Sequence, residues 1–203
     1  MQIKKIKKKD YKKAINYAIV GMDLKRYFSN NANSKLLKVY GKYFFYLELL
    51  QATRVIAAYE DNNLVGVLLV NIKGQKKIVK SPFKKLYVKL VSLFMSIFYK
   101  NTASVYDKAN QEMFAKYKET NNPDGEILFL VSDPNCLGKG VGTFLLSELQ
   151  RVEKDKTIYV YTDDQCIYQF YEHRGFIKEG EKDIVMEFDD DIKLKCMLFS
   201  KKL

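Results

Sequence analysis

The stretch that most constrains the fold is residues 126–143 (EILFLVSDPNCLGKGVGT), which joins a short apolar run to a glycine-rich loop. The run at 127–131 is too short for a helix of its own and is bounded by turn residues, so it predicts a buried strand. Three glycines follow at alternate positions, and residues 144–152 have the pattern of an amphipathic helix. This stretch therefore predicts a strand, a loop and a helix in succession.

A strand, a glycine-rich loop and a helix in this order can form an anion-binding site. Glycine lets the backbone approach a ligand closely, and the first helical turn has free N–H groups at the positive end of the helix dipole. The spacing of Gly138, Gly140 and Gly142 fits neither a P-loop nor a Rossmann loop, which has its glycines directly after the strand. The pattern alone therefore indicates an anion site but not its ligand.

The composition of the 203 residues is that of a globular protein, with 47% hydrophobic and 29% charged residues. This length is enough for one domain with a sizeable core, or one domain with an insertion. We predict no transmembrane helix and no signal peptide, because no apolar run is long enough and the basic N-terminus is not followed by an apolar core. The three scattered cysteines argue against a disulfide framework or a zinc site and favour a reduced cytoplasmic protein.

The net charge of +11 is distributed unevenly along the chain. Residues 1–120 carry 24 Lys and Arg against 8 Asp and Glu, whereas residues 121–203 carry 11 against 16. A basic half can attract anionic ligands, acidic partners or anionic membranes, and a solvated lysine-rich surface is the alternative. No nucleic-acid-binding motif accompanies the lysines, so we expect no nucleic-acid partner.

The rest of the chain predicts alternating helices and strands. In order these are a short strand (2–5), a helix (11–22) with Asp10 as its N-cap, an irregular polar segment (24–33), a second helix (34–50) and a hairpin (54–59 and 64–72). Gly66 in the hairpin indicates a bulge or a close backbone approach. After the glycine-rich stretch come a strand (157–161), a helix beginning at Asp163 and Asp164 and ended by Gly175, and two strands (176–188 and 192–201) around a polar turn at 189–191.

Residues 73–122 differ in composition and predict a helical insertion packed on the main domain. A basic segment at 73–80 is followed by a helix at 82–99, opened by Pro82, and a further helix at 104–119. The apolar part of the first helix is too short to span a bilayer. We do not expect membrane contact, although interfacial contact remains an alternative, and this helix can bury its apolar side against another subunit in a homodimer.

Two motifs in this order resemble the GNAT superfamily of acyl-CoA-dependent N-acyltransferases. The first is the Val-x-x-Pro turn at 131–134 with the loop LGKGVGT at 137–143, and the second is FYEHRGF at 170–176. The resemblance covers about residues 126–176 and implies one α/β domain over 1–203, with a mixed, mostly antiparallel central sheet, flanking helices and the insertion at 73–122. Leu137 departs from the Arg or Gln that is usual in the family.

The resemblance also implies acetyl-CoA as donor, a primary amine of a small molecule or peptide as acceptor, and no metal. By this resemblance, the backbone near Leu130, Val131 and Ser132 holds the pantetheine and polarises the acyl carbonyl. The pyrophosphate is cradled by the loop and first helical turn, and a further cofactor contact falls at Asp164. The cradle residues are Gly138, Lys139, Gly140, Val141, Gly142 and Thr143.

Two side chains match catalytic positions of the family. Tyr171 matches the tyrosine that donates a proton to the departing sulfur, and Glu126 matches a carboxylate base that acts through water. The alternatives are a tyrosine that only packs, a solvated charge at a strand end, and a protein that binds CoA without catalysis. The basic half of the chain counts against a highly cationic acceptor, unless acidic residues of the C-terminal half line the acceptor cleft.

Overall fold

The computed structural model describes residues 1–27, 34–98, 102–186 and 191–203. Residues 28–33 of the polar segment predicted at 24–33, the end of the predicted helix at Tyr99 and residues 189–190 of the turn predicted at 189–191 lie outside these residues.

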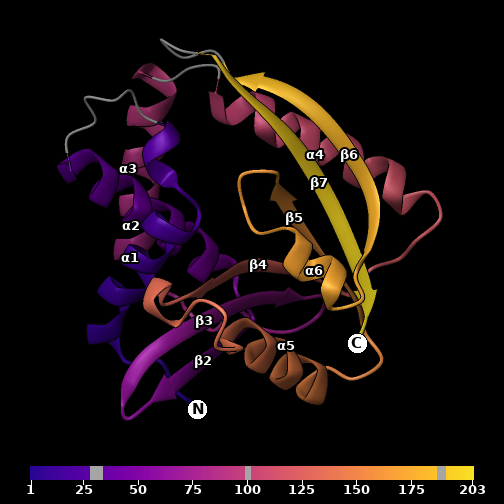
Figure 1. The fold of residues 1–203 in the computed structure, drawn as a ribbon. Coiled ribbons are helices and arrows are strands. Elements are labelled where there is room, and N and C mark those ends of the chain that lie inside the picture. The colour runs from indigo at the N-terminus through magenta and orange to yellow at the C-terminus, as the bar shows by residue number, and fades with distance from the viewer. Residues whose placement is uncertain (28–33, 99–101, 187–190) are drawn as a thin grey trace.

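A seven-stranded sheet runs through the molecule in the order β1-β2-β3-β4-β5-β7-β6 (Figure 1). Neighbouring strands are antiparallel except for β4 and β5, which are parallel, so the predicted mixed, mostly antiparallel sheet is confirmed. The strands are β1 (Gln2–Lys4), β2 (Arg54–Glu60), β3 (Asn63–Ile72), β4 (Gly125–Ser132), β5 (Thr157–Asp163), β6 (Ile177–Met186) and β7 (Ile192–Lys202).

Helices cover both faces of the sheet. The helices are α1 (Tyr11–Gly21), α2 (Ser34–Gln51), α3 (Pro82–Phe98), α4 (Thr102–Lys118), α5 (Val141–Val152) and α6 (Gln169–His173), with short 3-10 turns at Lys8–Asp10, Leu24–Tyr27 and Pro134–Cys136. One face is covered by α5 and α6, and the other by α1 and α2 over one half and by α4 over β6 and β7. Helix α3 packs on α2, so the two helices within 73–122 lie on different parts of the molecule (Figure 1).

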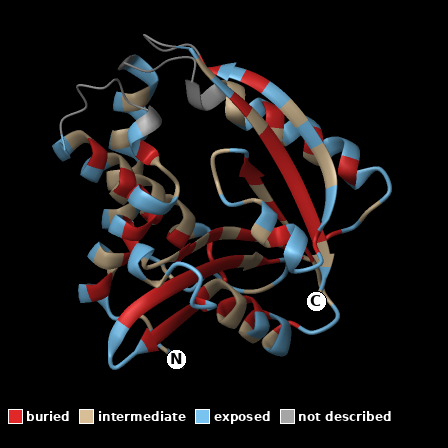
Figure 2. Ribbon diagram, in the orientation of Figure 1, coloured by how far each residue is buried: buried red, intermediate tan, exposed pale blue. Residues whose placement is uncertain are grey.

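Alternation along the strands divides the core between these faces, because successive side chains of a strand point to opposite sides. On β7, Met197 and Phe199 pack with α5 and α6, whereas Cys196 and Leu198 pack with α4. Figure 2 shows that buried residues are concentrated in the strands of the sheet. The central strands are therefore buried by helices on both sides.

The hairpin of β2 and β3 confirms the prediction made from Gly66. The register skips Val65, which makes a bulge, and a Cβ on Gly66 would lie 2.6 Å from Cγ1 of Val141 in α5. Only glycine allows so close an approach between β3 and the first turn of α5. This contact positions the start of α5 against the sheet.

One local prediction was confirmed only in part and another was wrong, because carboxylates accept from other partners. Asp10 stands at the N-cap of α1 without a capping bond, and its carboxylate instead accepts a 2.9 Å hydrogen bond from Tyr59 Oη. The helix that contains Tyr171 begins at Gln169 and not at Asp163. The carboxylate of Asp163 accepts from the backbone N–H groups of Gln165 and Cys166, which holds a turn where a helix was expected.

Candidate active site

Strands β4 and β5 pair over a short distance and then separate. Their parallel register joins only Gly125–Ile127 to Ile158–Val160. Beyond these pairs β4 continues to Ser132 beside β3, and β5 follows a different course (Figure 1). The β5-facing backbone groups of Leu130, Val131 and Ser132 thus have no pairing with β5, which leaves them available to a ligand.

A bulge in β4 sets which side chains face each side of the sheet. The register with β3 passes from Phe129 directly to Ile127, so Leu128 is the extra residue. Phe129 and Val131 therefore pack with α1 and α2, although Ile127 packs with α5. The same shift puts Glu126 on the side of α1 and α2.

The glycine-rich loop meets two geometric requirements of a backbone anion site. Gly138 and Gly140 have φ values of 77° and 78°, a left-handed conformation that favours glycine, and Gly140 is the N-cap of α5. Phe144 is the first residue of α5 whose N–H bonds back, to the carbonyl of Gly140 at 2.9 Å. The preceding N–H groups, of Val141, Gly142 and Thr143, are those that a helix start leaves for a ligand.

Replacing Gly140 with alanine is expected to weaken acetyl-CoA binding. A left-handed conformation costs a non-glycine residue about 1–2 kcal/mol, so the loop should either shift or lose stability by that amount. We expect the dissociation constant measured by calorimetry to rise about tenfold. The matched control is Gly21→Ala at the end of α1, where φ is not positive and nothing lies within 4 Å of the added Cβ. Equal affinities for the two variants would contradict the proposed cradle.

The second motif places Tyr171 in an aromatic cluster on the α5 side of the sheet. Its ring packs against Phe170 and Phe176, with centroids 5.4 Å away in each case, and stacks on Phe199 at 6.2 Å. Within the described residues, its hydroxyl has no hydrogen-bond partner. Burial, followed by the nearby Cys166, raises the pKa of Tyr171, so the hydroxyl keeps its proton at neutral pH and can donate it.

The two motifs meet at the start of α5. A Cβ on Gly142 would lie 2.9 Å from Cζ of Phe170, the residue before Tyr171. Leu130, Val141 and Tyr171 all belong to one apolar cluster. The end of β4, the first turn of α5 and the helix of Tyr171 are therefore packed together, although they are separated in sequence.

The opposite side of the sheet carries Glu126. Tyr159, its neighbour across the β4–β5 register, donates a 3.0 Å hydrogen bond from Oη to Oε2 of Glu126. Burial raises the pKa of Glu126, and the hydrogen bond from Tyr159 and the charge of Lys77 oppose the rise. A carboxylate with a raised pKa is suited to accept a proton near neutral pH.

Glu48 of α2 is a second carboxylate on this side, and sequence reasoning did not identify it. Burial raises the pKa of Glu48 to about 8, the charges of Glu126 and Asp107 add to the rise, and Lys77 opposes it. Within the residues that the structure describes, the Glu48 carboxylate has no hydrogen bond or ion pair. These three carboxylates come from α2, β4 and α4, so only the tertiary structure brings them within electrostatic range, and no sequence pattern links them.

Replacing Glu48 with glutamine is expected to stabilise the protein at high pH. The pKa of Glu48 is raised from 4.5 to about 8 on folding, so the free energy of unfolding falls as pH rises between these values. Glutamine does not titrate, so Glu48→Gln should match the parent near pH 5 and exceed it near pH 9 by on the order of 3 kcal/mol. Urea unfolding at both pH values measures this. The control is Glu119→Gln, because Glu119 is exposed. If the free energy of unfolding depends on pH identically in the parent and in Glu48→Gln, the prediction is wrong.

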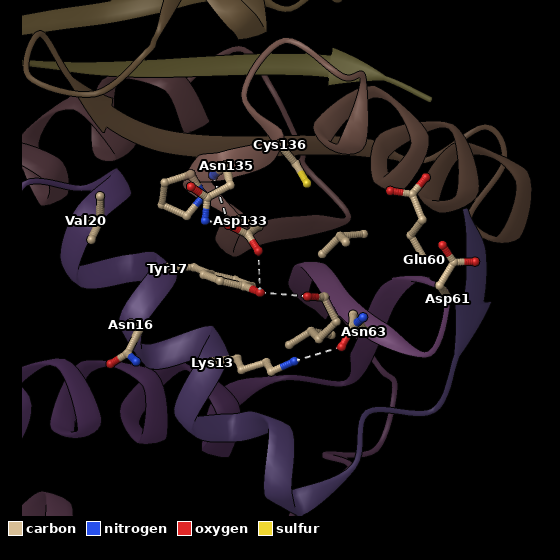
Figure 3. Close-up of a pocket in the computed structure, with 13 residues that line it drawn as sticks. Lys13, Asn16, Tyr17, Val20, Glu60, Asp61, Asn63, Asp133, Asn135 and Cys136 are labelled. Carbon is tan, nitrogen blue, oxygen red and sulfur yellow. Dashed lines mark hydrogen bonds between the residues drawn. The ribbon is translucent and has the colours of Figure 1, made fainter.

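A cavity of about 690 Å³ opens beside the turn that follows β4 (Figure 3). The hydroxyl of Tyr17 in α1 lies 2.7 Å from the carbonyl oxygen of Leu64 and 2.9 Å from Oδ2 of Asp133, and both oxygens accept from it. A second cavity, of about 360 Å³, lies between α5 and α6 and is lined in part by Thr143. None of the other predicted site residues lines either cavity. The hydrogen bond from Tyr17 to Asp133 links α1 to the turn before the glycine loop.

The predicted site residues fall into three groups. Leu130, Val141, Gly142 and Tyr171 pack together around the start of α5, and Glu126 lies on the other side of the sheet. Asp164 is separate from both groups, because its carboxylate accepts from the backbone N–H of Lys195 in β7. Among the described residues no cluster of three or more acidic, histidine or cysteine side chains is placed to hold a metal ion.

A strand that parts from its neighbour beside a glycine-rich helix start, with a tyrosine packed against it, is the arrangement of an acetyltransferase. The sequence model of the acetyltransferase (GNAT) family matches residues 22–176. The chain therefore belongs to this family, whose donor is acetyl-CoA. A search of curated proteins finds no match.

Solved structures agree with this fold over nearly the whole chain. One titled as histone acetyltransferase HPA2 and related acetyltransferase, from Corynebacterium glutamicum, is 16% identical with a TM-score of 0.59, covering 99% of this chain and 95% of that one. The protein PH1933 from Pyrococcus horikoshii is 18% identical with a TM-score of 0.54, covering 100% and 98%. A GCN5-related N-acetyltransferase from Rhodopseudomonas palustris is 12% identical with a TM-score of 0.53, covering 100% and 95%. At these identities the likeness shows the fold.

Proposed function

We propose that residues 1–203 form one acetyltransferase domain that transfers an acetyl group from acetyl-CoA directly to a primary amine. The observation that carries this proposal is the meeting of the two motifs, where Phe170 lies against Gly142 beside the end of β4–β5 pairing. This packing supports a site in which the start of α5 binds an anion close to the unpaired end of β4 and to the protonated Tyr171. The three unpaired cysteines support a reducing compartment, the cytoplasm.

The groups that bind acetyl-CoA in this proposal are mainly backbone groups. The N–H groups of Val141, Gly142 and Thr143 bind the pyrophosphate, and glycines at 138 and 140 give the loop its shape. Backbone groups of β4 near Leu130 hold the pantetheine and polarise the acetyl carbonyl. Tyr171 donates its proton to the sulfur as the thiolate leaves, since burial keeps that proton in place until the transfer.

The acceptor enters from the face that carries Glu126. An amine must lose its proton before it can attack, and we propose that Glu126 accepts this proton through water, with Tyr159 holding the carboxylate in position. Glu126 and Asp107 lie within electrostatic range of Glu48, and burial raises the pKa of Glu48 to about 8, so this carboxyl group is mainly protonated at neutral pH. A bound cation favours the ionised forms of these groups, so acceptors that carry a second positive charge are favoured, although the basic first half of the chain counts against a highly cationic acceptor.

Acetyl-CoA mixed with a panel of amines tests the proposal. The panel contains monoamines, diamines and lysine peptides, and the released CoA thiol is followed with a thiol reagent. We expect amine-dependent thiol release, an N-acetylated product by mass spectrometry and the lowest KM for acceptors with a second positive charge. Binding of acetyl-CoA without turnover of any amine would favour the rival function, a CoA-binding module without catalysis.

A further inference from the structure

Helix α3 presents three different faces along its length. The first packs inward, where the ring of Tyr87 lies edge-on to Tyr46 of α2 with centroids 5.6 Å apart, and Met95 packs against the core of the α1–α2 side. Lys84 extends over the ring of Tyr46, with Nζ 4.8 Å from its centroid. The residues of this face attach α3 to α2 and to the core beside it.

The second face is apolar and exposed to solvent. Its residues recur at intervals of three and four, so they form one stripe along the helix. They are Phe83 (71% exposed), Leu86 (55%), Leu90 (57%), Leu93 (58%), Phe94 (43%) and Ile97 (55%). A continuous apolar stripe of this length on a surface marks an interaction site and not ordinary surface variation.

The third face is polar and basic, and it follows the stripe around the helix. It consists of the exposed Lys85, Lys89, Ser92 and Ser96, and Ser92 is a hydrogen-bond partner of Tyr43 in α2. Residues 73–98 contain seven lysines and no Asp or Glu. On the neighbouring helix α2, Lys42 lies over the ring of Tyr87, with Nζ 4.4 Å from its centroid. Lysines therefore flank the N-terminal half of the stripe.

We propose that α3 docks on the surface of a membrane that contains anionic lipids. An amphipathic helix with lysines beside a Leu and Phe face lies in the plane of the interface, with its apolar side among the acyl chains and its lysines at the headgroups. Among the described residues no helix is long and apolar enough to cross a membrane, so the contact is with one surface. A second copy of the chain fits less well, since pairing two stripes would bring two sets of lysines together without an acidic residue of α3 between them.

Vesicle binding tests this docking surface. The full-length protein is mixed with vesicles of phosphatidylcholine alone or of equimolar phosphatidylcholine and phosphatidylglycerol, and bound protein is separated by flotation. We expect binding to the anionic vesicles that weakens as salt is raised. Leu90→Glu should lower the partition coefficient about tenfold or more, and Lys85→Gln with Lys89→Gln should lower it about tenfold and reduce its salt dependence.

The matched control is Ile177→Glu, which puts the same charge at an apolar residue of β6 that is 67% exposed. It should bind vesicles as the parent does, and unchanged acetyl-CoA affinity in every variant shows that each is folded. The proposal is overturned if the parent does not float with anionic vesicles, or if Leu90→Glu and Ile177→Glu bind equally. It is also overturned if ultracentrifugation finds a dimer that Leu90→Glu dissociates, because a second copy then covers the stripe. The outcome does not depend on turnover, so it is separate from the test of acetyl transfer.

Discussion

Tyr171→Phe should lower kcat about a hundredfold or more while leaving the affinity for acetyl-CoA nearly unchanged. The substitution removes only the hydroxyl, and the ring contacts with Phe170, Phe176 and Phe199 remain. Because the hydroxyl has no partner among the described residues, its loss should not destabilise the fold. The lost rate then measures proton donation to the leaving thiolate. Steady-state kinetics with a saturating amine give kcat, calorimetry gives the affinity for acetyl-CoA, and thermal unfolding gives the stability.

Tyr168→Phe is the matched control for this experiment. Tyr168 stands immediately before α6 and is half-buried in the same apolar cluster, so the control repeats the chemical change three residues away. Its kcat should stay within about twofold of the parent value. A Tyr171→Phe enzyme that is as fast as the control would show that Tyr171 only packs.

Glu126→Gln should lower kcat/KM at neutral pH about a hundredfold and remove part of its pH dependence. The base works only when it has lost its proton, so kcat/KM of the parent should rise with pH through the raised pKa of Glu126. Glutamine keeps an oxygen that can accept from Tyr159, so the positions of both side chains are retained. The measurement is kcat/KM against pH for parent and variant with one amine.

The variant Glu48→Gln, measured in the same assay, shows whether Glu126 or Glu48 is the base. If Glu126 is the base, Glu48→Gln should change KM for cationic amines more than kcat, and the rising limb of the pH profile should persist. If the limb disappears in Glu48→Gln and persists in Glu126→Gln, the role proposed for Glu126 is wrong and Glu48 is the base. The exposed Glu119→Gln should follow the parent at every pH.

Local patterns predicted the features that depend on residues near one another in sequence. The order of strands and helices and the close approach at Gly66 follow from side-chain size and periodicity within short windows. The start of the helix that contains Tyr171 was predicted wrongly, because the Asp163 carboxylate accepts from the backbone N–H of Gln165. Asp10 is at its predicted N-cap position, but its carboxylate accepts from the distant Tyr59 and makes no capping bond. Such choices depend on packing that brings separate segments together.

Glu126 was predicted from the family motif, but the carboxylates near it could not be predicted, for the same reason. Glu48, Asp107 and Glu126 stand on different elements and have no common spacing in the sequence. The charge totals of the two halves of the chain do not show where the few acidic residues of the basic half lie. The exposure of the α3 stripe was likewise invisible, since a periodic apolar face in sequence usually predicts burial.

The extra residue in β4 limits how this protein can vary in evolution. Leu128 allows Glu126 and Phe129 to face the same side, although their positions differ by three, an odd number. Exchanging the Leu128 side chain for another leaves the facing of its neighbours unchanged, but deleting the residue would turn Glu126 toward α5 and Ile127 toward α1 and α2. Relatives that keep this chemistry should therefore differ freely in the identity of this residue and hardly ever in the length of the segment.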